Sequence, residues 1–282
     1  MLEDKHIIEA LGKAQVTIEN GKITSITQPE IDYCPIFGKY HNIQKLTKEE
    51  IRKNIEYRIA DFGMCTKDRV LKMDDMLSVG ISEILRSNVE LGNIDCVVGA
   101  CEGTGTLLMT DADLVQGVGG RVSGLVSTTP IPEIIEQVGR ENILDPETAE
   151  LNQLKGLEMA IDKGYKNIAV TILPCPMVKQ LREYPVDDDV NVYIFVAHTT
   201  GTSVDETKML FETADIVTAC SSKNIIEYAQ IKKPYYYGES VPIYAISEDG
   251  RRLLDVRLNH INKPSSTNEY PQDLDKMSKP LK

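Results

Sequence analysis

Three cysteines and one histidine follow apolar segments at intervals along the chain. Cys101, Cys175 and Cys220 come one to three residues after runs that we expect to be buried strands, and His198 holds the equivalent place after a fourth run. The carboxyl ends of parallel strands gather at one edge of a sheet, where ligands bind, so we expect these four side chains along one rim. Such a rim suits metal binding, acid–base work or nucleophilic attack.

Three interpretations of the thiols compete. Free cysteines often serve as small apolar fillers of a core. They also ligate iron–sulfur clusters and other soft metals, and the absence of a Cys-x-x-Cys motif means that such ligands would be distant in sequence. The candidate ligands are Cys101, Cys175 and Cys220, joined by Cys34 or Cys65 from the N-terminal part. The third interpretation is catalytic, with Cys101 beside Glu102 and Cys220 facing it as nucleophile or acid–base group.

Glycine-rich segments form a second set of candidates for binding an anion. Successive backbone N–H groups in such turns make a concave anion site, and Arg121 can add a bidentate contact to a phosphate or carboxylate. The residues concerned are Gly103, Thr104, Gly105, Thr106, Gly119, Gly120 and Arg121, with Thr199, Thr200 and Gly201 after His198. Neither a dinucleotide fingerprint nor a P-loop is present. Tight turns and helix caps are the alternative explanation.

The elements that must position these residues divide the chain into three parts. Residues 93–262 alternate apolar runs with helical patterns, which predicts an α/β body with a largely parallel, three-layer sheet. Residues 1–92 predict an N-terminal subdomain with a β-hairpin at Asn20-Gly21 and a helix capped by Thr47. Residues 263–282 are polar and aperiodic, and we expect a flexible tail.

Composition excludes several classes of function. The chain has 282 residues, with 31 lysines and arginines against 43 acids, so its net charge of −12 argues against nucleic-acid binding. No signal peptide is expected, and no apolar run approaches the roughly 20 residues of a membrane span. We therefore expect a cytoplasmic protein with no membrane partner, whose cysteines are reduced.

Long motifs in the chain resemble the methanogenesis marker protein 8 family. They lie at residues 31–35, 59–66 and 69–77, then at Cys101-Glu102-Gly103-Thr104-Gly105, and at residues 114–132. The resemblance runs from about Gly12 to Leu258. It implies an archaeal, cytosolic role near methyl-coenzyme M reductase, its nickel cofactor or the assembly of such redox machinery. It implies no substrate and no catalytic residues.

Taken together, the residues and the resemblance lead to one principal expectation and two alternatives. The principal expectation is an accessory or assembly protein of archaeal methanogenesis, with redox or assembly proteins as partners and an iron–sulfur cluster or metal at its cysteine-lined rim. The first alternative is an enzyme that acts on a small anionic metabolite through a cysteine. The second is a catalytically inert scaffold with a binding rim.

Overall fold

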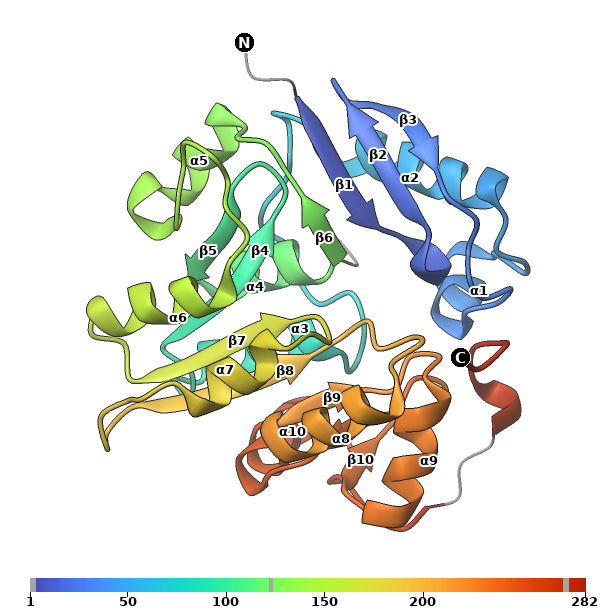
Figure 1. Ribbon diagram of the computed structural model, residues 1–282, viewed down its shortest axis with the longest axis vertical. Helices are drawn as coiled ribbons and strands as arrows, with labels where there is room; N and C mark the ends of the chain where they lie inside the picture. Colours follow the sequence, from blue (N-terminus) through green and yellow to red (C-terminus); the bar gives the residue numbers. More distant parts are fainter. Residues whose placement is uncertain (1–3, 122–123, 271–273) are drawn as a thin grey trace.

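A computed structural model of the chain describes residues 4–121, 124–270 and 274–282. Its strands form two sheets (Figure 1). The larger sheet has seven strands in the order β10-β11-β9-β8-β7-β4-β5, and the smaller has four in the order β3-β2-β1-β6. We call the smaller sheet, with helices α1 (Pro35–His41) and α2 (Lys48–Phe62), the N-terminal lobe. The larger sheet and its helices form the body.

The body sheet is mixed, which corrects the expectation of a largely parallel one. Its parallel strands are β4 (Cys96–Cys101), β7 (Asn167–Ile172), β8 (Asn191–Val196) and β9 (Ile216–Thr218). Its antiparallel additions are β5 (Gly105–Met109), β10 (Tyr235–Tyr237) and β11 (Ile243–Ala245). Short connections are the cause, because strands joined so closely form a hairpin and must run antiparallel: residues 102–104 join β4 to β5, and residues 238–242 join β10 to β11.

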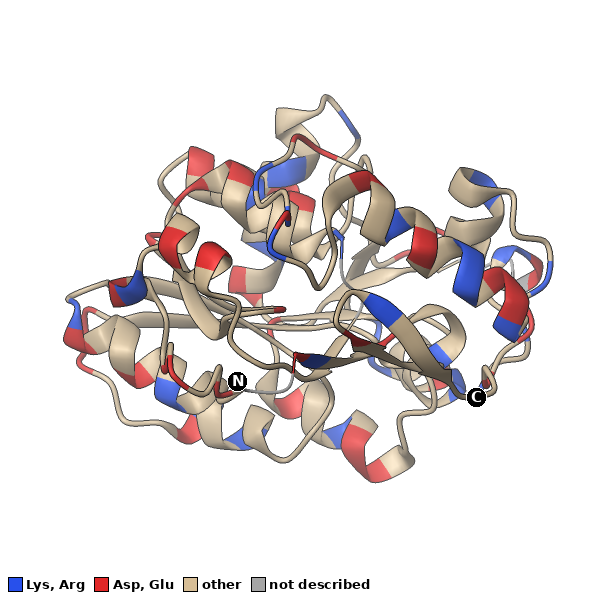
Figure 2. Ribbon diagram, turned by 90° about the horizontal axis from the view of Figure 1, so that it is seen from above, with Lys and Arg blue, Asp and Glu red and all other residues tan. Residues whose placement is uncertain are grey.

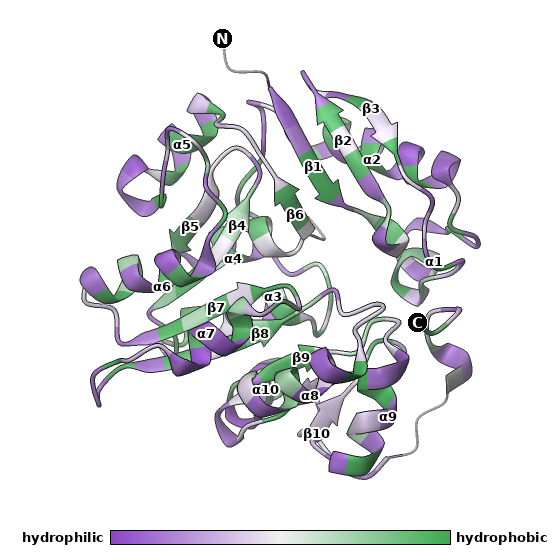
Figure 3. Cartoon of the chain, in the orientation of Figure 1, coloured by the Kyte–Doolittle hydropathy of each residue, from purple (hydrophilic) through white to green (hydrophobic). Residues whose placement is uncertain are grey.

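Helices cover both faces of the body sheet because alternate strand residues point to opposite sides. In β8, Ile194 and Val196 face one apolar core and Phe195 faces the other. The first core is closed by α6 (Gln153–Asp162), α7 (Met177–Glu183), α8 (Val204–Thr213) and α9 (Lys223–Lys232). The second is closed by α3 (Ile81–Glu90), α4 (Ala112–Gly119), α5 (Pro132–Val138) and α10 (Glu248–His260). Figure 3 shows hydrophobic colouring along β7 and β8 between these helices.

The N-terminal lobe is built around the predicted hairpin. Strands β2 (Gln15–Glu19) and β3 (Lys22–Ile26) pair across Asn20-Gly21, whose φ angles of 50° and 70° match the predicted turn. Helix α2 begins where the sequence predicts, with the Thr47 side chain accepting from the Glu50 N–H at 3.2 Å. The sequence did not predict strand β1 (Lys5–Glu9), which precedes the short 3-10 turn η1 (Leu11–Lys13).

One strand of the N-terminal sheet comes from the middle of the chain. Strand β6 (Gly124–Ser127) pairs antiparallel with β1, and Figure 1 shows the two side by side. The backbone N–H of Lys5 also donates to Thr129 Oγ1 at 3.0 Å. The smaller sheet therefore takes a strand from residues that the sequence assigned to the α/β body, and the two parts of the molecule are interwoven.

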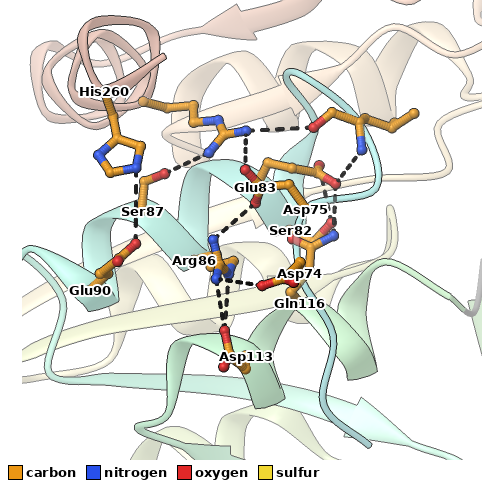
Figure 4. Close-up of polar contacts among 12 residues, drawn as sticks. Asp74, Asp75, Ser82, Glu83, Arg86, Ser87, Glu90, Asp113, Gln116 and His260 are labelled. Carbon is orange, nitrogen blue, oxygen red and sulfur yellow. Dashed lines mark hydrogen bonds and ion pairs between the residues drawn. The ribbon is translucent and has the colours of Figure 1, made fainter. Parts of the chain in front are cut away.

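Buried charges fix the segment between α2 and α3 (Figure 4). Arg257 of α10 donates to Asp75 Oδ2 at 2.7 Å and to Ser87 Oγ at 2.9 Å. Glu83 of α3 accepts from the side-chain amide of Gln116 in α4 at 2.7 Å. Because these bonds join three helices that pack against one another, we regard this network as structural.

Residues 277–282, part of the segment expected to be a flexible tail, contact both parts of the molecule. Lys279 and Tyr33 exchange two backbone hydrogen bonds, and Ser221 Oγ donates to the carbonyl of Pro280 at 2.7 Å. Met277 is fully buried in the core beside α9. It follows the short 3-10 helix η3 (Leu274–Lys276). We call residues 277–282 the C-terminal strap; the chain terminus lies beside α1 and α9 in Figure 1.

Charged residues lie mainly on the outer surfaces of helices and on loops. Figure 2 shows the strands largely free of Lys, Arg, Asp and Glu and the surrounding helices banded with both signs. Across the described parts of the chain, the helices are too short or too polar for any of them to span a bilayer. Charges buried inside the molecule are therefore exceptions to this pattern.

Candidate functional site

Four of the predicted residues follow neighbouring strands of the body sheet. Cys101 is the last residue of β4, and Cys175, His198 and Cys220 follow β7, β8 and β9. These strands are adjacent and parallel, so their carboxyl ends share one edge, which we call the rim. The geometry of the side chains at the rim decides which of the expected chemistries it supports.

The rim does not collect the cysteines into a metal site. Within residues 4–121, 124–270 and 274–282, no three His, Cys, Asp or Glu side chains are grouped so that they could hold a metal ion. All six cysteines are free thiols. Electrostatic proximity links four of them in two pairs instead: Cys65 with Cys101, and Cys34 with Cys220. The expected cluster, which would also use Cys175, therefore gains no support from this arrangement.

Cys101 and Glu102 lie beneath the rim, shielded from solvent. Both side chains are buried, and Cys101 Sγ donates to Glu102 Oε2 at 3.3 Å. Burial, and then the Glu102 carboxylate, raise the pKa of Cys101 well above its ordinary value, and the same two causes raise the pKa of Cys65. Because only the thiolate is a good nucleophile, this position argues against the catalytic role expected for Cys101.

Arg58 and Arg69 lie near Glu102, Arg121 lies beside Arg69, and we call Arg58, Arg69 and Arg121 the arginine cluster. Arg69 Nε lies 2.6 Å from Glu102 Oε1, and its Nη2 donates to the carbonyl of Gly117 at 2.9 Å. Arg58 of α2 donates from Nη1 to the carbonyl of Arg121 at 3.0 Å. Arg69 is 1% exposed and Arg58 8%. Three guanidinium groups therefore lie close together, two of them near one buried carboxylate, where the N-terminal lobe meets the body.

The positive charge of the arginine cluster is incompletely neutralised. Arg121 Nη1 is buried without a hydrogen-bond partner, and Arg58 makes a single side-chain hydrogen bond among the described residues. Arg121 Nε donates to Met73 Sδ at 3.0 Å, and Arg69 and Arg121 both stack on Phe62, at 4.8 and 4.5 Å from the ring centroid. Burial lowers the pKa of Arg58 to about 10, with Glu102 opposing and Arg69 reinforcing the shift, so Arg58 stays a cation at neutral pH.

His198 and Lys13 border the arginine cluster in strained backbone conformations. Their φ angles are 57° and 63°, and positive φ outside glycine is uncommon and concentrates at functional sites. Burial, followed by the charges of Lys13 and Arg58, lowers the pKa of His198 to about 4, so this imidazole is neutral at pH 7. Neither side chain forms a hydrogen bond or ion pair with another residue that the structure describes. Both are free to contact a ligand.

Carboxylates near these cations limit where an anion can bind. Glu9 lies close enough to Lys13 and Glu30 to feel both charges, and burial, as the largest cause, raises its pKa. Asp61 lies near Arg121 without forming an ion pair. An anion beside Lys13 would therefore meet Glu9, whereas among the described residues Glu102 alone forms an ion pair with a member of the arginine cluster.

The turn at residues 102–106 is a hairpin whose amides are already bonded. The backbone N–H groups of Gly103, Thr104 and Thr106 all donate to protein oxygens. Their acceptors are Thr128 Oγ1 and the carbonyls of Cys101 and Glu150, at 2.8, 3.2 and 2.9 Å in that order. Gly105, with φ 69°, lies so near Ala149 that a Cβ would come within 2.2 Å of its carbonyl oxygen. These contacts favour the tight-turn explanation over an anion-binding nest.

The second glycine-rich segment is helical, which corrects the expectation of a turn. Gly119 ends α4 and Gly120 caps it, donating its N–H to Gln116. Gly117, in the last turn of the helix, allows a close approach, since a Cβ there would lie 1.8 Å from the carbonyl oxygen of Leu71. Arg121, just after the helix, reaches the arginine cluster, so it is the member of this segment with a geometry suited to an anion.

The turn at residues 198–201 follows β8 and is hydrogen-bonded to the end of β9 and to the turn after it. Thr199 Oγ1 donates to the carbonyl of Thr218 at 2.6 Å, and Thr200 Oγ1 accepts from the Ser221 N–H at 3.3 Å. Gly201 has φ 75°. The two threonine hydroxyls that we expected to contact a ligand therefore make contacts within the protein.

Sequence reasoning missed Lys13, Arg58 and Arg69. A usable signal existed for Arg58, which follows Ile55 by three residues and so shares the apolar face of its helix. An arginine on such a face must be paired or functional. Lys13 and Arg69 lie in irregular segments, where no periodic pattern indicates burial.

Comparisons with other proteins agree with an archaeal origin of this architecture. Residues 6–259 match a family model described as an uncharacterized protein conserved in archaea, DUF2099. An uncharacterized protein of Methanocaldococcus jannaschii is 38% identical over 282 residues, which cover 99% of each chain. No solved structure matches the chain significantly. The extent of the family match and of the identity shows that this chain belongs to the DUF2099 family of proteins conserved in archaea.

Proposed function

We propose that this protein binds a small anionic metabolite, carrying a carboxylate or a phosphate, at the arginine cluster. The supporting observation is the imbalance of buried charge: Arg58, Arg69 and Arg121 lie together, Glu102 is the carboxylate paired with one of them, and Arg121 Nη1 is buried without a hydrogen-bond partner among the described residues. A buried cation without a partner is costly, and an anion would supply it with charge-assisted hydrogen bonds. The anion would bridge α2 of the N-terminal lobe and the segment after α4.

The neighbouring groups favour a ligand with polar atoms next to its anionic group. His198 is neutral at pH 7, so its ring can donate one hydrogen bond and accept another. Lys13 adds a cation near Glu9. These side chains lie on separate segments of the chain, so one ligand that contacts His198 and Arg58 would link β8 with α2.

The wider role that we infer is an accessory function in the methanogenesis machinery of archaea, in the cytoplasm. The resemblance to methanogenesis marker protein 8 and the relative in a Methanocaldococcus species support it. An iron–sulfur cluster is not part of this proposal, because no three His, Cys, Asp or Glu side chains of the described residues are grouped so that they could hold a metal ion. Metal and sulfide analysis of anaerobically purified protein tests that choice: near-stoichiometric iron and acid-labile sulfide would restore the cluster hypothesis.

Thermal unfolding in the presence of simple anions tests the binding proposal. We expect phosphate or citrate to raise the midpoint of unfolding above that in sodium chloride of equal ionic strength. Ligand at about 100 times its Kd stabilises the folded state by roughly 2.7 kcal/mol. Arg58→Gln and Arg121→Gln should each abolish most of this rise.

Arg52→Gln is the matched control, because Arg52 lies on the same helix as Arg58 but pairs with Glu56 at the surface. This variant should keep the full response to phosphate and citrate. Equal responses in Arg52→Gln, Arg58→Gln and Arg121→Gln would place any bound anion elsewhere and overturn the proposal. So would the lack of a shift with either anion in the unaltered protein.

A further inference from the structure

The C-terminal strap brings two partly exposed cysteines, remote in sequence, to the same place. On one side of the strap, Tyr33 donates to the carbonyl of Lys279 at 3.0 Å and accepts from its N–H at 3.1 Å. On the other side, Ser221 Oγ donates to the carbonyl of Pro280 at 2.7 Å. Cys34 follows Tyr33 and Cys220 precedes Ser221. The two cysteines therefore flank consecutive residues of one strap.

The side chains of Cys34 and Cys220 are close enough to influence each other. Cys34 contacts Ser278 of the strap, and Cys220 is among the groups that raise its pKa, although burial is the larger cause. Cys220 Sγ lies 3.3 Å from Thr218 Oγ1. Together with the hydrogen bonds of the strap, this proximity distinguishes the pair from Cys175, which is also partly exposed.

Backbone conformation and exposure also single out this pair. Cys220 has φ 42°, which a residue with a side chain adopts at an energetic cost and which persists where the surrounding structure imposes it. Cys65 and Cys101, the other pair in proximity, are fully buried. A small reagent in solution can therefore reach Cys34 and Cys220, whereas the Cys65 and Cys101 pair is shielded.

We propose that Cys34 and Cys220 form a reversible disulfide between the N-terminal lobe and the body, by exchange with a small-molecule disulfide. The Cys220 thiolate attacks a sulfur of the small disulfide, because burial raises the pKa of Cys34 and disfavours its thiolate; a mixed disulfide forms and one small thiolate is released. The second cysteine thiolate then attacks the protein sulfur of the mixed disulfide and releases the second small thiolate. Two electrons pass from the cysteines to the small disulfide, and the two cysteine protons end on the released thiols.

The link would tie the N-terminus of α1 to the turn after β9. Reduction by an excess of small thiol reverses both steps, so the state of the pair would follow the thiol–disulfide balance of the solution. This inference is independent of the anion proposal, because neither Cys34 nor Cys220 belongs to the arginine cluster.

Incubation of the folded protein with oxidised glutathione tests the pair. Remaining thiols are then blocked with N-ethylmaleimide, and the protein is digested without reduction for mass spectrometry. We expect a peptide pair linked through Cys34 and Cys220, two fewer alkylated thiols than in the reduced protein, and full recovery of both after dithiothreitol.

Single serine variants distinguish a specific link between Cys34 and Cys220 from non-specific oxidation of cysteines. Cys34→Ser should leave Cys220 carrying glutathione, because the resolving thiol is gone, whereas Cys220→Ser should leave Cys34 largely unmodified, because the attacking thiol is gone. Cys175→Ser is the matched control and should form the linked peptide as the unaltered protein does. Cys34 and Cys220 that each stay free, or each carry glutathione without linking, would overturn the proposal.

Discussion

Glu102 balances part of the charge of the arginine cluster from a position fully shielded from water. Its removal would leave Arg69 buried without its carboxylate. We expect Glu102→Ala to lower the free energy of unfolding by roughly 3–5 kcal/mol, the usual cost of breaking a buried ion pair. Urea denaturation measures the change.

Glu133→Ala serves as the control for Glu102→Ala, because Glu133 is exposed on α5. A surface substitution of this kind changes the free energy of unfolding by no more than about 0.5 kcal/mol. Losses of similar size in the two variants would mean that water reaches the arginine cluster, and that its charges need no partner.

His198 gives the folded protein a pH dependence of known sign. Its pKa falls from an ordinary value of 6.5 to about 4 on folding, so between these pH values the unfolded chain binds more protons than the folded one. Stability is therefore fully present above pH 6.5 and is lost as the pH falls towards 4. The shift corresponds to roughly 3 kcal/mol at most.

We expect His198→Asn to remove much of the loss of stability between pH 6.5 and 4. Asparagine tolerates the left-handed backbone at this position, so the change tests the imidazole. Urea denaturation at a series of pH values gives the slope for each protein. His260→Asn, on α10 near Glu90, is the control. A slope that persists unchanged in His198→Asn would assign the pH dependence to other groups.

The sequence located part of the candidate site but not its charge balance. Arg121 was predicted as a ligand-binding residue because a guanidinium beside a glycine-rich turn suits an anion, and His198 because it follows a predicted strand. The convergence of Arg58 and Arg69 on Glu102 depends on contacts across 33 residues or more. Such contacts follow from packing between the lobe and the body, which no local pattern encodes.

At the scale of elements, the packing of α4 depends on Gly117, because no space is left there for a side chain. A Cβ at Gly117 would lie 1.8 Å from the carbonyl oxygen of Leu71, a backbone atom that cannot move alone. We expect Gly117→Ala to destabilise the fold by roughly 1–3 kcal/mol, as overpacking usually does, and to loosen residues that lead to Arg69. Chemical denaturation measures the first effect and phosphate-induced stabilisation the second.

Gly119→Ala is the matched variant within the same helix, where the added Cβ would lie 3.4 Å from Ser82 Cβ. Alanine is the better helix former by about 1 kcal/mol, so this change should be neutral or stabilising. Equal destabilisation by the two variants would show that helix propensity, and not the contact with Leu71, limits this segment.

Elements with a strong local signal were predicted correctly, and those defined by distant pairing were not. The Asn20-Gly21 hairpin and the Thr47 cap of α2 depend on neighbours within a few residues. Strand β6 exists because it pairs with β1, more than 100 residues away, and β5 because the turn at Gly103 reverses the chain. Polarity alone predicted a flexible tail, although residues 277–282 contact both parts of the molecule.

At the scale of the whole molecule, the local charge of the site opposes the net charge of the chain. The protein carries −12 at neutral pH, whereas the arginine cluster is positive. An anion therefore approaches through a repulsive field and is held by short-range contacts once it arrives. Added salt screens the long-range repulsion between phosphate and the chain more than it weakens the buried contacts. It should therefore raise the association rate of phosphate more than its dissociation rate.

The C-terminal strap supplies a last test of how the lobe and the body are joined. Met277 is fully buried in the body, and two residues later Lys279 bonds to Tyr33 of the N-terminal lobe. We expect Met277→Ala to cost roughly 2–5 kcal/mol through the cavity it leaves, and to speed hydrogen exchange at the Tyr33 amide. Met76→Ala, at a site that is 44% exposed, should change neither. Unchanged exchange at Tyr33 in a destabilised Met277→Ala would mean that the strap belongs to the body alone, and that the lobe is held by the arginine cluster and β6.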